Sequence, residues 1–287
     1  MLGNESSREE LEDYIREQLR KDVSPEIIEE VLISEGWTME DIRPVFASIR
    51  KSAQSTLKPL PSINILLSDS FKIFKKLLRI VVSIYVVLAI GEAFSNEDFL
   101  MFVGTDKSST LAALLSILSV GLILISYTVL TYSVVHNGSI KSVRAAYKEG
   151  AFLTPSYILV VLIYAAAVFG GMILFIVPGI IFGVWYSVSV YVLFAEKRYG
   201  TNALARSSQY VRFRWLDVFW RIIGIVGLAF LVNLLSDFLG TMIKGHLILK
   251  LLITRPLQFA VFTLVTIYMY ELYRSLRETY RKAFEVT

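Results

Sequence analysis

The chain carries few side chains that could perform catalysis. Its two histidines are His136 and His246, and it has no cysteine. The patterns HExxH, GxSxG and the P-loop, which mark zinc hydrolases, serine hydrolases and nucleotide-binding enzymes, are all absent from the sequence. Catalysis requires a nucleophile, a base or a set of metal ligands within hydrogen-bond reach of a partner. We therefore expect no enzyme activity, no cofactor and no metal site, and we interpret His136 as a turn residue.

Three polar side chains lie inside apolar segments and are the remaining candidates for an intramembrane site. Glu92 lies in the first such segment, and Asn233 and Asp237 lie one helical turn apart in the fifth. A lone carboxylate at the centre of a bilayer costs about 2.5–3.5 kcal/mol, and less near an interface. Two interpretations stay open: these side chains reach outer water or pair with Lys244 or Lys250, or they line an outward-facing polar cavity.

The segment that decides the fold class is a run of 38 residues, Tyr157 to Phe194, without a charged side chain, histidine, asparagine or glutamine. As one helix it would reach about 57 Å, nearly twice the roughly 30 Å hydrocarbon core of a bilayer. The run must therefore fold back within a membrane or at its edge. Pro178-Gly179 lies near its middle, where proline removes a helix donor and glycine permits a turn. We predict a membrane hairpin with its outer turn at these two residues.

The overall composition also indicates a polytopic membrane protein. Hydrophobic residues make up 55% of the 287 residues and charged residues only 19%, and the mean hydropathy is +0.58. We expect an all-α fold, a six-helix transmembrane bundle preceded by a small three-helix cytoplasmic bundle. The predicted spans are Leu77–Phe94, Leu111–Val134, Ser156–Val177, Gly179–Ala195, Val218–Gly240 and Pro256–Leu272.

The distribution of lysine and arginine predicts the orientation of these spans. The segments expected on one side carry 16 of these residues, and the loops on the other side carry 4. Cytoplasmic loops carry the excess of positive charge in membrane proteins. We therefore expect a multi-pass protein of the cell membrane, in contact with membrane lipids, with both termini in the cytoplasm.

The charge also divides the chain into two parts. Residues 5–52 carry 13 acidic and 7 basic side chains, whereas the remainder carries 12 acidic and 22 basic ones. We expect three regions: a soluble acidic head (residues 1–52), a proline-containing linker (residues 53–62) and a transmembrane domain (residues 63–287). The acidic surface of the head would repel phosphate, so we expect no nucleic-acid partner.

Residues 7–51 predict three short helices, because N-cap and proline signals each precede an apolar stripe at helical spacing. The segments SPEIIEEVLISEGW (24–37) and MEDIRPVF (39–46) resemble the compact ubiquitin-associated-like three-helix modules. The resemblance implies a docking module for a cytoplasmic protein, with Gly36, Trp37 and Met39 as the contact surface. The alternative is a solvated bundle without a dedicated ligand.

Three segments that precede the first, third and fifth spans share a pattern. Residues 62–72, 138–148 and 200–212 each contain an aromatic residue nine or ten positions in, followed closely by a basic side chain. We interpret each as an in-plane amphipathic helix that leads into a helical hairpin. The alternative is that inner loops generally carry such residues, because snorkelling and headgroup anchoring favour them.

The transmembrane part also resembles a known family. The segments LSDSFKIFKKLLRI (67–80), LFIVPGIIFGVWYSVSVYVLFAEKRYG (174–200) and NALARSSQYVRFRWLDVF (202–219) carry the likeness. They resemble six-span bacterial membrane proteins that include the membrane portion of some glycerophosphoryl diester phosphodiesterases. The resemblance implies the six-span fold, but the phosphodiesterase activity belongs to a separate barrel domain that this sequence does not contain. No catalytic residue is therefore carried over.

These observations favour a non-enzymatic role. We expect a membrane anchor or scaffold that recruits a cytoplasmic partner through the head. The alternative is a transporter or channel subunit with an outward-facing polar cavity. Such a protein would bring several charged residues together near the middle of the membrane, and only Glu92, Asn233 and Asp237 come near that position.

Overall fold

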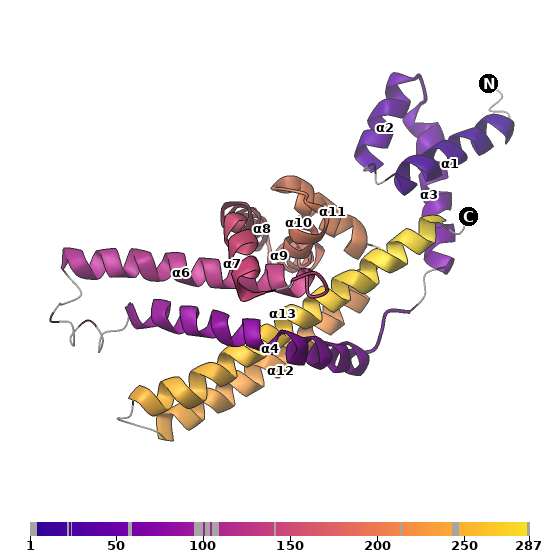
Figure 1. Cartoon of the computed structure of the whole chain (residues 1–287). Helices are drawn as coiled ribbons and strands as arrows, with labels where there is room; N and C mark the ends of the chain where they lie inside the picture. Colours follow the sequence, from indigo (N-terminus) through magenta and orange to yellow (C-terminus); the bar gives the residue numbers. More distant parts are fainter. Residues whose placement is uncertain are drawn as a thin grey trace. The chain divides into compact units, whose positions relative to one another are not determined.

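The computed structural model describes residues 5–21, 23, 25–56, 59–94, 100, 104, 109–140, 142–212, 214–242 and 247–285. Within these residues every regular element is a helix (Figure 1). The chain divides into two compact units. Unit 1 contains Met1–Leu60 and Arg274–Thr287, and unit 2 contains Pro61–Tyr273. The C-terminal end, which the sequence assigns to the transmembrane domain, is thus grouped with the head.

Unit 1 is built from α1 (Glu5–Arg20), α2 (Pro25–Ser34), α3 (Met39–Thr56) and the end of α13 (Leu247–Glu285). Each of the first three helices contributes one apolar face to a shared core, which excludes water from these side chains. Helix α3 continues to Thr56, so the first residues of the expected linker are helical. The buried core side chains are Leu11, Ile15, Leu19, Ile28, Leu32, Ile42, Val45, Phe46 and Ile49.

The turn between α2 and α3 is fixed by backbone and side-chain caps. Gly36 has φ +96°, a left-handed conformation that favours glycine. Its amide donates to the Ile33 carbonyl at 3.1 Å, and the amide of Trp37 donates to the Leu32 carbonyl at 3.0 Å. This pair of bonds is the Schellman motif that ends many helices. Thr38 then caps α3, since its hydroxyl oxygen accepts from the Asp41 amide at 3.3 Å.

Unit 2 contains the apolar helices. Among the described residues, five helical segments are long and apolar enough to cross a membrane, and these indicate a membrane-embedded protein. The all-helical membrane fold expected from the sequence is therefore confirmed at this level. The predicted sixth span lies within α13, a helix of 39 residues that is not one of the five. The five are α4 (Ile63–Phe94), α6 (Thr110–Val135), α8 (Thr154–Leu174), α9 with α10 (Ile176–Trp185 and Ser189–Glu196), and α12 (Trp215–Met242).

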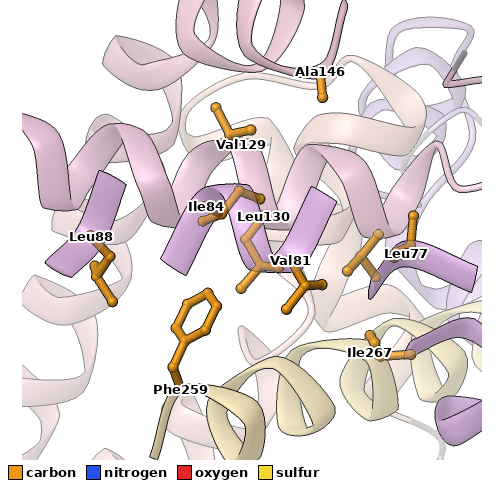
Figure 2. Packing of buried hydrophobic residues seen from close by; sticks show 10 residues of the cluster. Leu77, Val81, Ile84, Leu88, Val129, Leu130, Ala146, Phe259 and Ile267 are labelled. Atoms are coloured by element: carbon orange, nitrogen blue, oxygen red, sulfur yellow. The ribbon is translucent and has the colours of Figure 1, made fainter. Parts of the chain in front are cut away.

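The core of unit 2 lies along α4 and α6. Buried residues of α4 recur at alternating spacings of four and three, from Leu77 through Val81, Ile84 and Leu88. Figure 2 shows these side chains among those of α6 and α13. At the far end of the pair, Gly91 lets the helices approach closely, since a Cβ there would lie 3.1 Å from the Leu122 Cβ.

Polar residues of α6 face this core rather than lipid. Ser119, Ser126 and Ser133 recur every seven residues, and each is 1% exposed or less. Small side chains at such spacing allow helix backbones to pack closely within a membrane. The burial of these serines indicates that this face of α6 contacts other helices.

The long apolar run does form a hairpin, but its turn is not at Pro178-Gly179. Helix α8 ends at Leu174, α9 begins at Ile176, and the single residue Phe175 between them is extended, with φ −160° and ψ 150°. Pro178 lies within the first turn of α9. The physical reason is that the first helical turn has no intrahelical acceptors for its amides, so proline costs little there.

The two helices of this hairpin are in backbone contact at two glycines. A Cβ on Gly171 would lie 2.9 Å from the Gly179 amide nitrogen, and a Cβ on Gly179 would lie 2.9 Å from that of Met172. Neither position can accommodate a side chain without displacing backbone. The neighbouring Gly170 has nothing within 4 Å of its would-be Cβ. The close approach thus depends on Gly171 and Gly179.

Short separate helices are present in two of the three places where in-plane helices are predicted, and their orientation relative to a membrane stays a prediction. Helices α7 (Val143–Phe152) and α11 (Thr201–Arg212) are short and separate, whereas residues 63–72 are part of the continuous helix α4. Each short helix packs against the hairpin that precedes it, α7 on α4 and α6, and α11 on α8, α9 and α10. The interpretation of the first segment as a separate helix is therefore wrong, because its apolar positions continue the face of α4 without a break.

Candidate functional site

The candidate contact surface of the head surrounds the turn between α2 and α3. Met39 is 38% exposed, Trp37 is partly buried and Gly36 is exposed. Ile33, in the last turn of α2, is 48% exposed, although no sequence motif distinguishes it. We call Ile33, Gly36, Trp37 and Met39 the head patch. Exposed aliphatic side chains beside a rigid turn are suited to contact with another protein.

The three intramembrane polar candidates do not meet at one point. The Asn233 amide nitrogen donates to the Ala229 carbonyl of its own helix at 2.8 Å, which satisfies it locally. Glu92 and Asp237 instead contact side chains of α13. The sequence therefore identifies two members of a polar cluster and one residue outside it.

This cluster, which we call the α13 polar cluster, consists of Glu92, Asp237, Arg255 and Gln258. Gln258 Nε2 donates to Asp237 Oδ1 at 2.8 Å, and Arg255 Nη1 donates to Gln258 Oε1 at 3.4 Å. Arg255 Nε lies 3.9 Å from Glu92 Oε2. Of the partners expected from the sequence, Lys244 and the side chain of Lys250 lie outside the described residues.

A second charged cluster, which sequence reasoning missed, lies between α10, α11 and α13. Glu196 and Arg206 have side chains only 6% and 4% exposed, and Arg206 Nε lies 3.4 Å from Glu196 Oε2. The hydroxyls of Tyr210 and Tyr273 both donate to Glu196 Oε1, at 2.8 and 2.6 Å. We call these four residues the Glu196 cluster.

Arg206 is held by more than the carboxylate. Its Nε donates to the Tyr210 hydroxyl at 2.9 Å, its Nη1 donates to Gln209 Oε1 at 2.9 Å, and its guanidinium lies 4.6 Å from the Tyr210 ring centroid. Removing one partner of a buried ion pair typically costs about 3–5 kcal/mol, because it leaves a charge without compensation. The Glu196 cluster therefore attaches the short helix α11 to α10 and α13.

The sequence contains a partial signal for this cluster. Arg206 and Tyr210 are four residues apart on one helix and therefore share a face. Glu196 lies in the segment that carries the family resemblance. Tyr273 lies far along the chain in an ordinary helical pattern, so nothing in the sequence connects it to Glu196.

A related contact attaches α7 to α6. The Tyr132 hydroxyl of α6 donates to the Glu149 carboxylate of α7. The Tyr147 hydroxyl of α7 donates to the Ser83 carbonyl of α4 at 3.2 Å. Burial raises the pKa of Tyr147, so this hydroxyl stays protonated and remains a donor. Both short helices are thus attached to the preceding hairpin by a tyrosine–glutamate hydrogen bond. The glutamate lies on the short helix α7 in the first case, and the tyrosine lies on the short helix α11 in the second.

The break between α9 and α10 interrupts an apolar segment of 21 residues. Backbone groups freed inside a membrane must find partners within the protein. The Ser207 hydroxyl of α11 donates to the Trp185 carbonyl at 2.7 Å, and the Tyr164 hydroxyl of α8 donates to the Gly183 carbonyl at 3.2 Å. Helix α11 thus stabilises the interruption in addition to carrying the Glu196 cluster.

His136 lies at the C-terminal end of α6 and contacts Tyr132. The His136 Nδ1 lies 3.1 Å from the Tyr132 carbonyl oxygen, and the two rings stack with centroids 4.3 Å apart. His246 lies outside the described residues. Among the residues that the structure describes, no group of three or more histidine, aspartate or glutamate side chains could hold a metal ion.

Comparisons with known proteins give no relative for this chain. No family model matches it, and no curated protein or solved structure shows significant similarity. The resemblances described from the sequence motifs therefore stay expectations.

Proposed function

We propose that the protein is a non-enzymatic membrane anchor or scaffold that recruits a cytoplasmic protein through the head. The observation that carries this proposal is the head patch, where Ile33 and Met39 are 48% and 38% exposed beside the capped turn at Gly36. The fixed turn holds these side chains in place before binding, so little conformational entropy is lost on association.

The charge of the head indicates the chemistry of the partner. Residues 5–52 carry 13 acidic and 7 basic side chains. A complementary partner would insert an apolar side chain at the head patch and surround it with lysine or arginine. Opposite charges across such a contact raise the association rate and select the partner.

The membrane topology belongs to the same proposal. We include the α13 segment Pro256–Leu272 as a sixth span, which places both termini on one side, and the 16-to-4 distribution of basic residues makes that side the cytoplasm. The ubiquitin-associated-like resemblance of residues 7–51 supports a docking role for the head. Under this topology the head and the last turns of α13 share the cytoplasmic compartment, in agreement with their grouping in unit 1.

The transporter alternative has less support. Its best observation is the α13 polar cluster, which brings Glu92 and Asp237 to Arg255 and Gln258. These residues lie near helix ends, since α4 ends at Phe94 and α12 at Met242. A substrate site of a transporter is expected near the middle of the membrane instead.

Site-specific photocrosslinking of the full-length protein in cells tests the proposal. A photoreactive amino acid at Met39 should give one discrete protein adduct, and the same group at the exposed Glu10 of α1 should not. Ile33→Glu should abolish the adduct, while Asp237→Asn should leave both the adduct and the phenotype of the gene unchanged. The scaffold would be refuted by equal crosslinking at Glu10 and Met39, or by a silent Ile33→Glu variant. Loss of function in Asp237→Asn alone would favour the transporter.

A further inference from the structure

The α13 polar cluster lies at the end of the bundle where α4 and α12 end. Glu92 is about 3 Å of helix from the end of α4 at Phe94, and Asp237 is about 8 Å from the end of α12 at Met242. Arg255 is about 12 Å from the start of α13 at Leu247, and its long side chain can extend further toward that end. These depths match the headgroup region and the adjoining edge of the hydrocarbon core.

The cluster is open to its surroundings rather than enclosed. The side chains of Glu92 and Arg255 are 35% and 46% exposed, and Asp237 is exposed as well. By contrast, the side chains of the ion pair in the Glu196 cluster are 6% exposed or less. A molecule in the surrounding lipid layer can therefore reach both signs of charge in the α13 polar cluster.

The contacts of Arg255 leave much of its hydrogen-bonding capacity unused. In the part of the chain that the structure describes, its guanidinium lies 3.9 Å from Glu92 and 3.4 Å from Gln258. Charge-assisted hydrogen bonds are usually about 2.7–2.9 Å long, so both contacts are long. A guanidinium has five N–H donors in a fork that matches a phosphate. Arg255 is thus suited to a phosphate group at headgroup depth.

The two carboxylates favour a cation beside that phosphate. Asp237 accepts one hydrogen bond from the Gln258 amide, which adds no positive charge. Both acids also lie in the C-terminal parts of their helices, where the helix dipole is negative and stabilises cations. Among the described residues Asp237 contacts no basic side chain, so its carboxylate would stabilise an additional cation at this position.

We propose that the α13 polar cluster binds the headgroup of phosphatidylethanolamine from the surrounding leaflet. The lipid phosphate accepts hydrogen bonds from Arg255, and the lipid ammonium donates to Asp237. Phosphatidylcholine has the same charges, but its ammonium has no N–H group to donate. Phosphatidylglycerol has the phosphate without any cation. A comparison of the three headgroups therefore distinguishes the contribution of Arg255, which binds the phosphate, from that of Asp237, which binds the ammonium.

Native mass spectrometry of the full-length, delipidated protein tests this assignment. The three dioleoyl lipids are offered at equal concentration, and the lipid retained by each protein molecule is counted. The loss of a charge-assisted hydrogen bond corresponds to roughly a tenfold change in affinity, so phosphatidylethanolamine should be retained about tenfold better than the other two. Equal retention of all three lipids would overturn the proposal, and equal retention of phosphatidylethanolamine and phosphatidylglycerol would reduce it to a phosphate site.

Variants assign the two halves. Asp237→Asn should lower retention of phosphatidylethanolamine to the level of phosphatidylcholine without changing that of phosphatidylglycerol, and Arg255→Gln should lower retention of all three. Lys72 is an exposed cation near the start of α4 that pairs with Asp69 at 2.7 Å. Lys72→Gln is therefore the matched control and should leave the retention of all three lipids unchanged. Unchanged lipid preference in Asp237→Asn contradicts the proposal. If a variant does not fold, the comparison of lipids on the natural protein still decides.

Discussion

The Tyr273 hydroxyl donates to Glu196 Oε1 at 2.6 Å across 77 residues of sequence. Tyr273 is the last residue of unit 2, and α13 continues from it into unit 1. The contact thus attaches α13 to α10 within unit 2. The ring of Tyr273 also lies 6.0 Å from that of Tyr210, the second hydroxyl donor to Glu196.

We predict that Tyr273→Phe lowers the free energy of unfolding. The substitution removes the hydroxyl but keeps the ring contacts, and a hydrogen bond to a charged group contributes about 1.5–3 kcal/mol. Tyr199→Phe is the control, because Tyr199 is 49% exposed. Reversible unfolding in mixed micelles measures both. Equal stabilities for the two variants would show that the Tyr273 bond contributes nothing.

Glu196→Gln should have a larger effect. It leaves the buried guanidinium of Arg206 without its carboxylate, and such a loss typically costs about 3–5 kcal/mol. The double variant Glu196→Gln with Arg206→Met should recover part of the loss, because it removes the uncompensated charge. A double-mutant cycle on the same unfolding measurement gives the coupling energy. Strictly additive effects would contradict the pairing of these two side chains.

Two adjacent glycines of α8 provide a test of the hairpin contact. Gly171→Ala should destabilise the protein by about 1–3 kcal/mol, because its Cβ would lie 2.9 Å from the backbone nitrogen of Gly179. Gly170→Ala, with nothing within 4 Å, should be neutral or stabilise by up to about 1 kcal/mol. Thermal unfolding in detergent compares the two. The reverse order of stabilities would place the contact on the other face of α8.

The tip of this hairpin should be inaccessible to aqueous reagents. Ile173, Leu174, Phe175, Ile176 and Val177 are each at least 64% exposed and all apolar, so they belong in lipid rather than in water. The chain has no natural cysteine, which removes background labelling. Phe175→Cys should therefore resist an impermeant thiol reagent in intact cells, whereas Thr110→Cys should react. Rapid labelling at position 175 would place the turn in the aqueous phase.

The proposed orientation can be tested on one helix. Thr110 is the first residue of α6, and Ser139 lies in the turn four residues after its last residue, Val135; both are exposed. We expect an impermeant thiol reagent to label Thr110→Cys in intact cells and Ser139→Cys only after the membrane is opened. Ser275→Cys in α13 should behave like Ser139→Cys if both termini are cytoplasmic. Labelling of Ser139→Cys in intact cells would reverse the topology.

The apolar helices are well predicted from the sequence, because segments this long and this apolar can be kept away from water only inside a membrane. Element boundaries are harder to predict where one residue type is compatible with two local structures. Pro178 is compatible with a turn and with the first turn of a helix, and only the contact between Gly171 and Gly179 distinguishes them. Similarly, the basic residues at the start of α4 suit an in-plane helix or the snorkelling end of a span.

Some residues of the candidate sites can be predicted from the sequence, and others cannot. Glu92 and Asp237 are conspicuous because charges are rare in apolar segments, so the sequence identifies them directly. Their actual neighbours, Arg255 and Gln258, come from α13, and helical periodicity does not determine which helices are adjacent. Tyr273 is missed for the same reason, since its role depends on a contact with Glu196 that exists only after the helices pack.

The single-residue turn at Phe175 has a consequence for the biosynthesis of the protein. A hairpin with a polar loop requires that loop to be carried through the membrane during insertion, which exposes it to hydrocarbon. Here no charged side chain lies between Tyr157 and Phe194, so this segment can partition into lipid as one apolar body. We expect this step of biogenesis to proceed without translocation of a hydrophilic segment and to be insensitive to the electrical potential across the membrane.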